Sequence, residues 1–404
     1  MTIRQFGQMG QLAYGYAVFD PGGRQAVKTT NSVKILMSEG MHDTAIVTLR
    51  GESMNVPELQ PGTPVQIQYG WSALDLDWFY GYVDHIETQY QWAQPDPNHF
   101  NDVVCLGVSY ALKDPYLGSW SNVAASSIVA QIAKQYFLSS VIEANDYLWP
   151  SLGATGCTIW QFLCQLADKV GYTLSCNQSL LRFVSSDTST EQHWPSMPVF
   201  RTRNSAAGIV AQTISNFQAL QGDAMPTQVK AIRQVNGLDL NTGQIIGAVN
   251  DGTDSEPLGS TTVYPLFYQQ VSDTVVPSSG AALATLAGMS EANRWTYQAT
   301  ATLSGYTGVK QGMPIGIDGV DAANDGTWWV REVCHRIDSS NYAMDVLLGR
   351  DAIGSTGKQP IQGLMVAYSP QNPYSYTAAN VPPTILVNNR WRAQNTFTAY
   401  VNSA

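Results

Sequence analysis

Charged residues are scarce in this sequence. Asp, Glu, Lys and Arg make up 13% of the 404 residues, whereas globular chains usually carry about 25%. Aromatic residues are plentiful instead, with 11 Trp and 20 Tyr. Interface centres are enriched in aromatic residues and depleted in Lys and Glu. The composition favours a protein whose surface is partly covered by partners; a large Tyr-rich β-protein without special partners is the alternative that composition leaves open.

Basic residues are also outnumbered. The chain has 21 Lys and Arg against 31 Asp and Glu, and its formal net charge is -10. This charge argues against a protein that grips nucleic acid, because such a protein needs Lys and Arg to neutralise phosphates. A surface past which nucleic acid slides without sticking is still compatible with it.

Cysteine, histidine and long apolar runs are equally limited. The five cysteines are an odd number without C-x-x-C spacing, which is no disulfide framework and favours a reducing compartment. The five histidines form no ligand cluster, so we expect no metal and no cofactor. The first residues lack the apolar core of a signal peptide. No apolar run reaches about 18 residues, and we therefore expect no membrane anchor.

Strand patterns dominate residues 1–112. Residues 65–69 alternate apolar and polar side chains, as a half-buried strand does. Comparable segments lie at 12–19, 32–37, 45–49, 78–86 and 103–108. Short strands separated by turn residues indicate a barrel or a sandwich, and we expect a first β-barrel domain over 1–112.

Residues 113–205 have the pattern of a small α/β module. Ile128 and Ile132 belong to an amphipathic helical stripe. Thr158 and Gln161 match a capping box at the start of a second helix, and Gly171 is placed to end that helix in the left-handed conformation. A β-hairpin is predicted across 172–184.

Strand patterns return after the module, and we expect a second β-barrel domain over 206–352. A polar loop and a helix across 281–294 are predicted as an insertion near 250–295. The last segment, 353–404, is rich in Pro, Asn and Tyr and is expected to be an extended C-terminal arm that crosses to a partner. The fold class is thus β-rich α+β, with two related antiparallel β-barrels, the α/β module between them and the arm.

An internal repeat supports the pairing of the two barrels. At a constant offset of 250, residues 62–86 match 312–336, with Gly62 on Gly312, Pro64 on Pro314, Trp78 on Trp328, Val83 on Val333 and His85 on His335. Past a shorter hairpin, Gly107 matches Gly349. Such a repeat predicts a duplicated barrel. Three copies of a chain with two similar barrels can close a ring of six similar units.

Three segments resemble one known family. Residues 118–133 and 160–172 resemble the two helices of the middle module of phage baseplate hub proteins. Residues 78–83, Trp-Phe-Tyr-Gly-Tyr-Val, resemble a strand of the first hub barrel. The family includes the late control D proteins of contractile phages and the N-terminal hub part of the valine-glycine repeat proteins of type VI secretion. The resemblance covers roughly residues 10–350.

This resemblance implies a structural protein of a virion tail baseplate, or of a related contractile injection system, and not an enzyme. It implies a homotrimer that forms a quasi-sixfold ring between the hexameric tail tube and the trimeric central spike. The implied partners are the tail tube protein or a tube-initiator ring and the central spike protein. The tape measure protein and other baseplate proteins are further candidates.

The same resemblance implies a central channel through which DNA passes without specific binding, and the acidic balance fits such a lumen. It places assembly in the host cytoplasm. Because the chain stops at residue 404 without a needle, an OB-fold module or a lysozyme-like domain, we expect the spike and the cell-wall cleavage to reside in other proteins.

Histidines at matching repeat positions suggest a duplicated catalytic site. Backbone-bonded structural histidines are favoured for His85 and His335, because a catalytic His needs a positioned partner and Asp84 is expected on the opposite strand face from His85. Cys157 and Cys164 are expected to be small apolar residues. The segments 305–308 and 316–319 lack the Lys-Ser/Thr of a phosphate loop and are expected to be barrel turns.

Two alternative functions rest on other residues. A tail-associated cell-wall hydrolase would need Glu332 and Asp345 as a carboxylate pair in a cleft, and scattered surface acids are favoured instead. A carbohydrate-binding tail module would use Trp328 and Trp329 as a sugar platform. Neighbouring strand residues face opposite ways, so one Trp in the core and one at a subunit contact is favoured. No catalytic, cofactor-binding or metal-binding residue is assigned.

Overall fold

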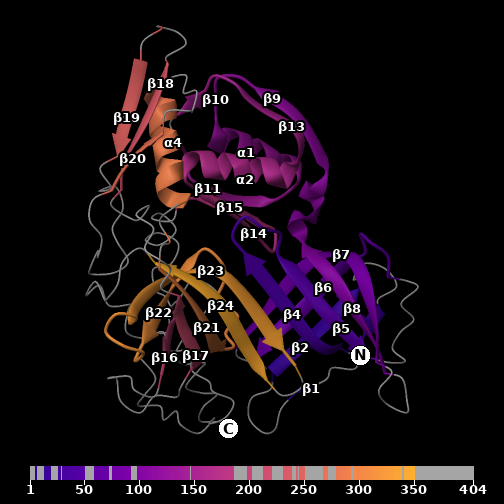
Figure 1. Cartoon of the computed structure of the whole chain (residues 1–404). Coiled ribbons are helices and arrows are strands. Elements are labelled where there is room, and N and C mark those ends of the chain that lie inside the picture. Colours follow the sequence, from indigo (N-terminus) through magenta and orange to yellow (C-terminus); the bar gives the residue numbers. More distant parts are fainter. Residues whose placement is uncertain are drawn as a thin grey trace, which may run out of the picture.

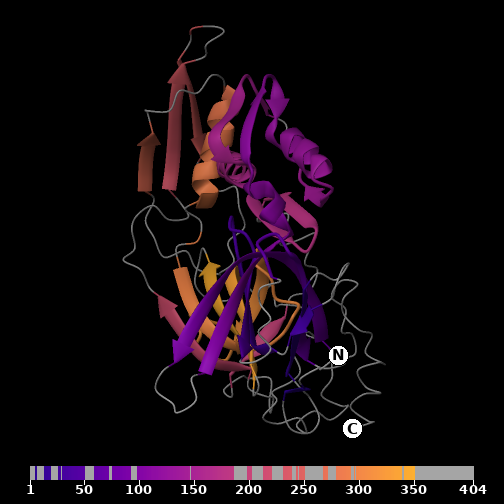
Figure 2. The same cartoon turned by 90° about the vertical axis from the view of Figure 1, so that its right-hand side faces the viewer.

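Strands dominate the computed structural model of the chain, so the β-rich character of the predicted fold class is confirmed. Figures 1 and 2 show two β units side by side at one end of the molecule and the helices at the other. The predicted arm, 353–404, lies outside the described residues. The structure describes residues 5–6, 13–19, 26–28, 30–50, 59–71, 75–91, 98–145, 147–185, 198–202, 213–220, 231–238, 243, 245–250, 267–271, 279–292, 295, 297–338 and 341–350.

The first β unit consists of β1 (Gln5–Phe6), β2 (Ala13–Phe19), β3 (Ala26–Lys28), β4 (Thr30–Ser38), β5 (Thr44–Arg50), β6 (Pro64–Trp71), β7 (Asp75–Gln91) and β8 (Asn98–Gly107). Its strand order is β1-β2-β6-β7-β8-β5-β4, with β3 paired to β2. The predicted alternation of β6 is confirmed, because Val65, Ile67 and Tyr69 are buried.

The second β unit consists of β16 (Val199–Arg201), β17 (Ile214–Leu220), β21 (Tyr297–Ser304), β22 (Met313–Asp318), β23 (Gly326–Ile337) and β24 (Tyr342–Arg350). It continues the sheet of the first unit, because β23 pairs antiparallel with β4, and the order proceeds β23-β24-β21-β17. β22 pairs with β23 and, in parallel, with β16. Among the described strands, neither unit closes into a hydrogen-bonded ring.

The middle module comprises η3 (Val108–Lys113), β9 (Pro115–Trp120), β10 (Val123–Ala124), α1 (Ala125–Gln135), β11 (Ser139–Ile142), β12 (Leu148–Trp149), β13 (Leu152–Thr158), α2 (Ile159–Val170), β14 (Thr173–Asn177) and β15 (Leu180–Val184). The predicted capping box is confirmed, since Thr158 and Gln161 each bond the backbone of the other. Gly171 ends α2 with a φ of 72°. The predicted hairpin is the antiparallel pair β14–β15.

A further group of elements lies beside the module: β18 (Ala231–Leu238), β19 (Ile245–Asn250), β20 (Phe267–Val271) and α4 (Ser279–Ala292). The predicted helix is therefore present as α4, and its Ala281, Ala282 and Leu286 share a buried cluster with α1 and α2. A Cβ at Gly288 would collide with the backbone oxygen of Asp168, so α4 approaches α2 closely. In the described part of the chain, no helix is long and apolar enough to span a membrane.

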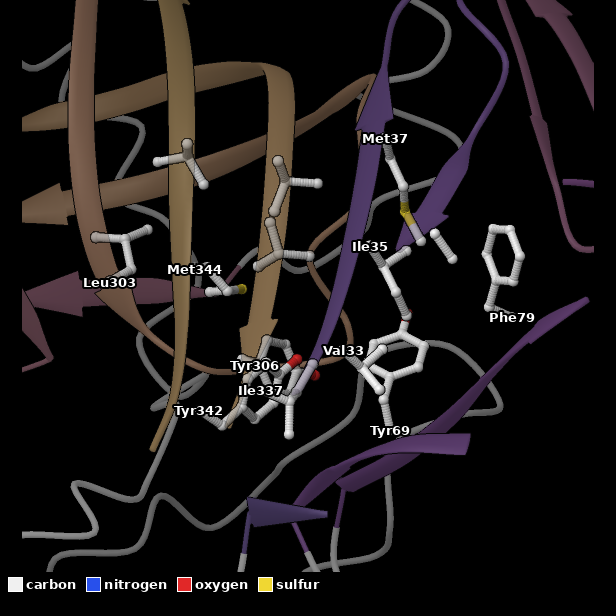
Figure 3. Packing of buried hydrophobic residues seen from close by; sticks show 14 of the residues in the cluster. Val33, Ile35, Met37, Tyr69, Phe79, Leu303, Tyr306, Ile337, Tyr342 and Met344 are labelled. Atoms are coloured by element: carbon white, nitrogen blue, oxygen red, sulfur yellow. The ribbon is translucent and has the colours of Figure 1, made fainter. Parts of the chain in front are cut away.

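One apolar core runs through both β units. Val33, Ile35 and Met37 of β4 lie between residues of the two units, with Tyr69 on one side and Met344 on the other (Figure 3). All five side chains are at most 1% exposed. Each fully buried side chain of this size contributes about 1.5–3 kcal/mol, so the two units stabilise one another through a shared interior.

The predicted repeat is present as a hairpin in each unit, but its second strand is displaced from the predicted alignment. Gly62 opens the first hairpin with a φ of 85°, and its N–H donates to the carbonyl of Val83 at 2.7 Å. Gly312 opens the second with a φ of 71°, and its N–H donates to the carbonyl of Val330 at 2.9 Å. Val83 thus corresponds to Val330, 247 positions later, and not to Val333.

β-bulges support the corrected alignment. The register of β7 against β8 shifts at Asp84, and that of β23 against β24 shifts at Arg331, again 247 positions later. A second matched pair of bulges lies at Asn31 in β4 and at Ser215 in β17. Bulges are specific local features of a strand pair. Five strands therefore correspond in chain order: β4 to β17, β5 to β21, β6 to β22, β7 to β23 and β8 to β24.

The predicted match of Gly107 with Gly349 is wrong by one residue. Leu106 lies opposite Tyr82, and Gly349 lies opposite Trp329. Because Tyr82 and Trp329 correspond, Gly349 is the counterpart of Leu106. A constant offset fails here because the connections between strands differ in length while the strand pairing is kept.

The largest difference between the units is one connection. β4 and β5 are joined by the turn 39–43, whereas 221–296 separate the corresponding β17 and β21. The elements β18 to β20 and α4 belong to this longer connection. The second unit is thus the first unit's five-strand pattern with an insertion at the position of the β4–β5 turn.

Candidate functional site

The β4–β5 turn contacts both of the other large parts of the chain. The N–H of Glu39 donates to the carbonyl of Arg331 in the second β unit at 3.1 Å. The N–H of Gly40 donates to the carbonyl of Leu174 in the middle module at 3.1 Å. The indole N–H of Trp160 on α2 donates to the carbonyl of Gly40 at 3.0 Å. We call the place where the three parts meet the junction. It comprises the turn 39–43 and the polar side chains that bond there: Tyr69, Asp77, Asn177, Gln178, Lys310, Gln311, Trp329 and Arg331.

A largely buried carboxylate, that of Glu39, lies on one side of the junction. Glu39 accepts from Nε of Arg331 at 2.7 Å and from the indole of Trp329 at 2.6 Å. Trp329 stacks on Trp295, with ring centroids 5.4 Å apart. Burial raises the pKa of Glu39, and the Arg331 guanidinium opposes that rise. Arg331 is the bulged residue of β23, so the bulge directs this guanidinium onto the first unit.

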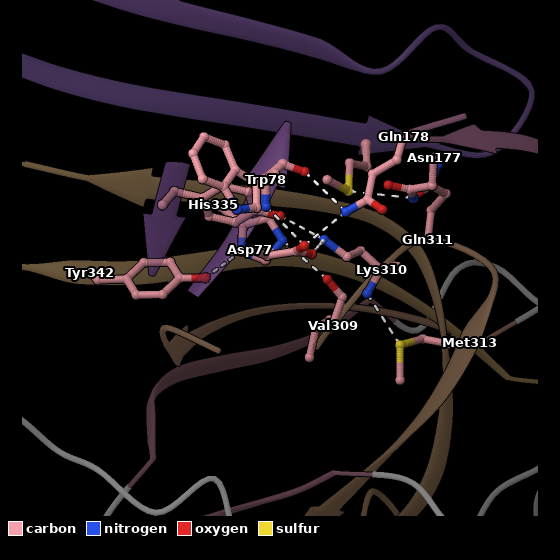
Figure 4. Close-up of polar contacts among 12 residues, drawn as sticks. Asp77, Trp78, Asn177, Gln178, Val309, Lys310, Gln311, Met313, His335 and Tyr342 are labelled. Carbon is pink, nitrogen blue, oxygen red and sulfur yellow. Dashed lines mark hydrogen bonds and ion pairs between the residues drawn. The ribbon is translucent and has the colours of Figure 1, made fainter. Parts of the chain in front are cut away.

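A buried lysine occupies the other side of the junction (Figure 4). Nζ of Lys310 lies 2.8 Å from a carboxylate oxygen of Asp77 and donates to the hydroxyl of Tyr69 at 2.6 Å. Burial alone would lower the pKa of Lys310, but Asp77 and Tyr69 together raise it above its usual value. Lys310 belongs to the second unit and both partners to the first, so this ion pair joins the two units inside the protein.

Amide side chains extend the network to the middle module. Gln311 donates to Asp43 at 2.9 Å and accepts from Asn177 at 3.0 Å. Gln178 donates to the same Asp77 carboxylate at 2.8 Å. Burial raises the pKa of Asp43 to about 8. All three parts of the chain therefore contribute polar side chains to the junction.

This arrangement is suited to holding parts in a fixed orientation. Removing one partner of a buried ion pair typically costs about 3–5 kcal/mol, because the other charge is left uncompensated. Any rotation of one β unit against the other would separate Lys310 from Asp77 and Arg331 from Glu39. The geometry therefore disfavours relative motion of the units.

A small open pocket lies beside the junction. It has a volume of about 170 Å³ and is lined by Glu39, Cys164, Asp168 and Arg331 among others. Its charged groups Glu39 and Arg331 are already paired with each other. Burial raises the pKa of Asp168. In the described ranges, no group of His, Cys, Asp and Glu could hold a metal ion.

The two histidines matched by the repeat are not equivalent. By strand pairing, His85 corresponds to Glu332 and His335 to Thr88. His335 is fully buried; its Nε2–H donates to the carbonyl of Val309 at 3.1 Å, so Nδ1 accepts from the hydroxyl of Tyr342 at 2.8 Å. Burial, reinforced by the nearby positive charge of Lys310, lowers the pKa of His335 to about 3.

His85 contradicts the prediction of a backbone-bonded histidine. It is half exposed, and its ring nitrogens bond Asp84 at 2.9 Å and Glu87 at 3.3 Å. The expectation that Asp84 faces away from His85 is wrong, because the bulge at Asp84 interrupts the alternation of side chains. The Asp84 contact raises the pKa of His85. Asp84 also pairs with Lys113 at 2.7 Å, so this group is a surface charge cluster.

The two Trp residues of the alternative sugar platform are not exposed. Trp328 and Trp329 do face opposite ways, but both are at most 1% exposed. Trp328 packs in the core and donates to the carbonyl of Asn324 at 2.8 Å. Trp329 lies inside the junction, so neither Trp is at the surface, where a subunit contact was expected for one of them. Neither ring is accessible for stacking on a sugar.

Glu332 and Asp345, weighed as a carboxylate pair and favoured as scattered surface acids, lie on an open face of the sheet. Asp345 forms an ion pair with Arg336 at 2.6 Å and accepts from Thr302 at 2.9 Å. Glu332 lies opposite Leu347 on the neighbouring strand, two positions along. The Asp345 side chain is 44% exposed. These contacts place the two carboxylates on the solvent-facing side of the sheet and not in the cleft that glycoside cleavage needs.

The remaining candidates have structural positions. Cys157 and Cys164 are free and partly buried, and burial raises the pKa of Cys164 to about 12. In the segment 305–308, a Cβ at Gly305 would collide with the ring of Tyr342. The carbonyl of Gly305 accepts from the indole of Trp71 in the first unit at 2.6 Å. The glycine allows this close approach, and the segment is a turn at the junction.

Sequence reasoning missed the charged residues of the junction. Lys310, Asp77 and Glu39 belong to no motif, and buried lysines are rare enough that none is expected from sequence. One signal is present in the repeat. At the offset of 250, Lys310 takes the place of Gln60, which is exposed in the first unit.

No family model matches the sequence, and no curated protein matches it. Its fold is similar to that of a 43 kDa tail protein of prophage MuSo2 from Shewanella oneidensis, with a TM-score of 0.57 and 12% identity over 83% of this chain and 99% of that chain. A tail protein from Neisseria meningitidis MC58 gives a TM-score of 0.55 and 11% identity over 86% of this chain and 99% of that one. The chain has the fold of phage tail proteins.

This tail-protein fold is also similar to a chain of the Francisella PdpA–VgrG complex, with a TM-score of 0.50 and 9% identity over 89% of this chain and 60% of that one. The predicted resemblance to tail and valine-glycine repeat proteins is therefore confirmed at the level of the fold. In this chain, the two β units and the middle module of that fold meet at the junction.

Proposed function

We propose that this tail-protein fold is a baseplate or tail hub subunit. Three copies form a ring of six β units that joins a hexameric tail tube to a trimeric central spike. Each β unit is a tube-like barrel in this assembly. The protein acts through shape and packing, and the junction keeps its two β units in the orientation that the ring requires.

The observation that carries this proposal is the duplication of the β unit. Five strands recur in the same chain order, with bulges at the corresponding positions Asp84 and Arg331, and Asn31 and Ser215. Two similar units in one chain allow three chains to present six similar surfaces, which is a way to match sixfold and threefold partners.

Charge supports a channel that does not retain DNA. The net charge of -10 repels the phosphate backbone. A ring lumen with this balance lets DNA pass without the basic contacts that hold it. Tube and spike proteins are the partners at the two ends of the ring.

The mass of the purified full-length chain tests the proposal. We expect a trimer in solution, or a trimeric ring at the tube–spike boundary in images of the assembled particle. A chain that stays monomeric in solution and is absent from that boundary in the particle would overturn the proposed function.

A further inference from the structure

The two β units of the chain contact each other through one pair of strands, and the register of this pairing can be compared with a contact between two chains. Residues 332–337 of β23 pair antiparallel with 33–38 of β4, with His335 opposite Ile35. The pairing buries Val33 and Ile35 on β4 almost completely. It uses the half of β23 that follows the bulge at Arg331, beyond the end of its pairing with β22.

The strands β4 and β23 have counterparts in the other unit, β17 and β7. On each counterpart, the edge that corresponds to the β4–β23 pairing is not occupied by a described strand. β17, the counterpart of β4, pairs only with β21 among the strands described. β7, the counterpart of β23, pairs with β6 only up to the bulge at Asp84. Beyond it, residues 85–91 of β7 pair with β8 on one edge, and no described strand lies on the other. The two edges belong to different units.

Side-chain exposure at these edges fits a missing neighbour. Phe217 and Ala219 of β17 are only partly buried, although their counterparts on β4 are buried. Thr88 of β7 is exposed, although its counterpart His335 is fully buried. The same residues are therefore covered in the contact within the chain and uncovered at the outer flanks.

The loop before each hairpin shows the same difference. Lys310 and Gln311 are buried against the first unit. Their counterparts Gln60 and Pro61 are exposed on the outer flank of the first unit. This loop precedes the hairpin whose second strand is β7, just as the loop with Lys310 precedes the hairpin whose second strand is β23.

The sequence of β17 is also that of a strand that accepts a neighbour. Its residues 214–220, Ile-Ser-Asn-Phe-Gln-Ala-Leu, carry no charge and no proline. Natural sheets protect exposed edges with charged residues, especially Lys, and with proline. The strand carries neither form of protection along its length.

We propose that the occupant is a second copy of this chain: β17 of one copy pairs antiparallel with residues 85–90 of β7 in the next copy. The register transferred from the internal contact places Ala219 opposite Thr88. The contact is head-to-tail, and three repetitions close the ring. This inference rests on the proposed trimeric function and names the strands and the register that build it.

A disulfide between copies tests the register. The variant carrying Thr88→Cys and Ala219→Cys should form covalent dimers and closed covalent trimers under mild oxidation, seen by non-reducing electrophoresis. Disulfides require Cα atoms within about 7 Å. The matched control carries Thr88→Cys and Asn216→Cys, which displaces one cysteine by three residues, or about 10 Å along the strand. We expect the control and both single variants to crosslink no more than the wild type.

The outcomes separate this inference from the proposed function. A trimer by mass that crosslinks equally in the test and control variants, or in neither, overturns the strand pairing and leaves the trimeric hub intact. A chain that is monomeric in solution and in the particle overturns both. Backbone hydrogen exchange of residues 216–220 gives a measurement without substitutions. We expect it to slow by about tenfold or more on trimer formation, and unchanged exchange in a trimer would also overturn the pairing.

Discussion

The two β units share the same strand order but differ in the loop before the hairpin, which is buried and charged in one unit and exposed and uncharged in the other. Both contain the same five strands and the same two bulges. In the second unit the loop before the hairpin holds Lys310, which is buried against Asp77. In the first unit the same loop holds Gln60, which is exposed. The strand pairing is the same in both units, whereas the side chains of the loop differ according to whether a neighbouring unit of the same chain packs against them.

The difference shows which features a duplicated unit must keep. Strand order, bulges and the glycines that open the hairpins define the backbone and recur. Buried charges are tolerated only where a partner is supplied by the same chain, because an unpaired buried charge is costly. The junction therefore reflects the contact between the units within the chain, which the outer flanks lack among the described residues.

The largest expected effect comes from removing the charge at the junction. Lys310→Met removes the cation that faces the buried carboxylate of Asp77 and should lower the free energy of unfolding by about 3–5 kcal/mol. The matched substitution Gln60→Met should change it by less than about 0.5 kcal/mol in the monomer. Urea unfolding of both variants, followed by tryptophan fluorescence, measures the difference. Similar small effects at the two sites would show that the Lys310 ion pair does not brace the units.

The buried and exposed histidines should respond differently to pH. His335 has a pKa lowered to about 3, so it stays neutral in the folded chain while the unfolded chain takes up a proton below about pH 6.5. Its contribution to stability is therefore complete above pH 6.5 and is lost as pH falls toward 3. His335→Gln should reduce the slope of unfolding free energy against pH, between 6 and 4, by up to about 1.4 kcal/mol per unit.

His85 provides the comparison for this measurement. Its pKa is raised by Asp84, so its contribution is present below its ordinary pKa and is lost as pH rises through the folded value. The side chain is half exposed, and exposed pairs contribute at most about 1 kcal/mol. His85→Gln should leave the acid slope unchanged. An equal change of slope in both variants would contradict the assigned burial.

A further pair of substitutions tests the equivalence of the two hairpins. Gly62 and Gly312 both have positive φ and no atom near the position of a Cβ. Gly62→Ala and Gly312→Ala should each cost about 1–2 kcal/mol from backbone strain alone. Gly153→Ala, at a glycine without positive φ, is the control and should cost less. Thermal unfolding measures these costs. Unequal costs for Gly62→Ala and Gly312→Ala would show that the two hairpins are not equivalent, contrary to the alignment from strand pairing.

Local features were predictable from the sequence because local chemistry determines them. The Thr158 capping box and the Gly171 stop depend on a few neighbouring residues, and both are present. The repeat was detectable from Gly62 and Gly312 because those positions require glycine. Its second strand was misaligned because a constant offset cannot represent connections of unequal length.

The junction was not predictable for a different reason. Asp77, Lys310 and Glu39 are distant in sequence and meet only after the sheet has continued from β4 to β23. A bulge at Asp84 also reversed the side-chain direction on which the prediction for His85 depended. Sequence periodicity assumes an uninterrupted strand, and an inserted residue breaks that assumption without leaving a recognisable pattern.

The long connection between β17 and β21 gives the molecule a direction. Its described elements, β18 to β20 and α4, lie at the end of the molecule where α1 and α2 also lie (Figure 1). In the proposed ring, the end that carries the two β units would repeat with each unit, and the end that carries the helices would repeat once per chain. A partner could then distinguish the two faces of the ring by rotational periodicity alone. For that proposed assembly, we expect the tube at the end that carries the β units and the spike at the end that carries the helices.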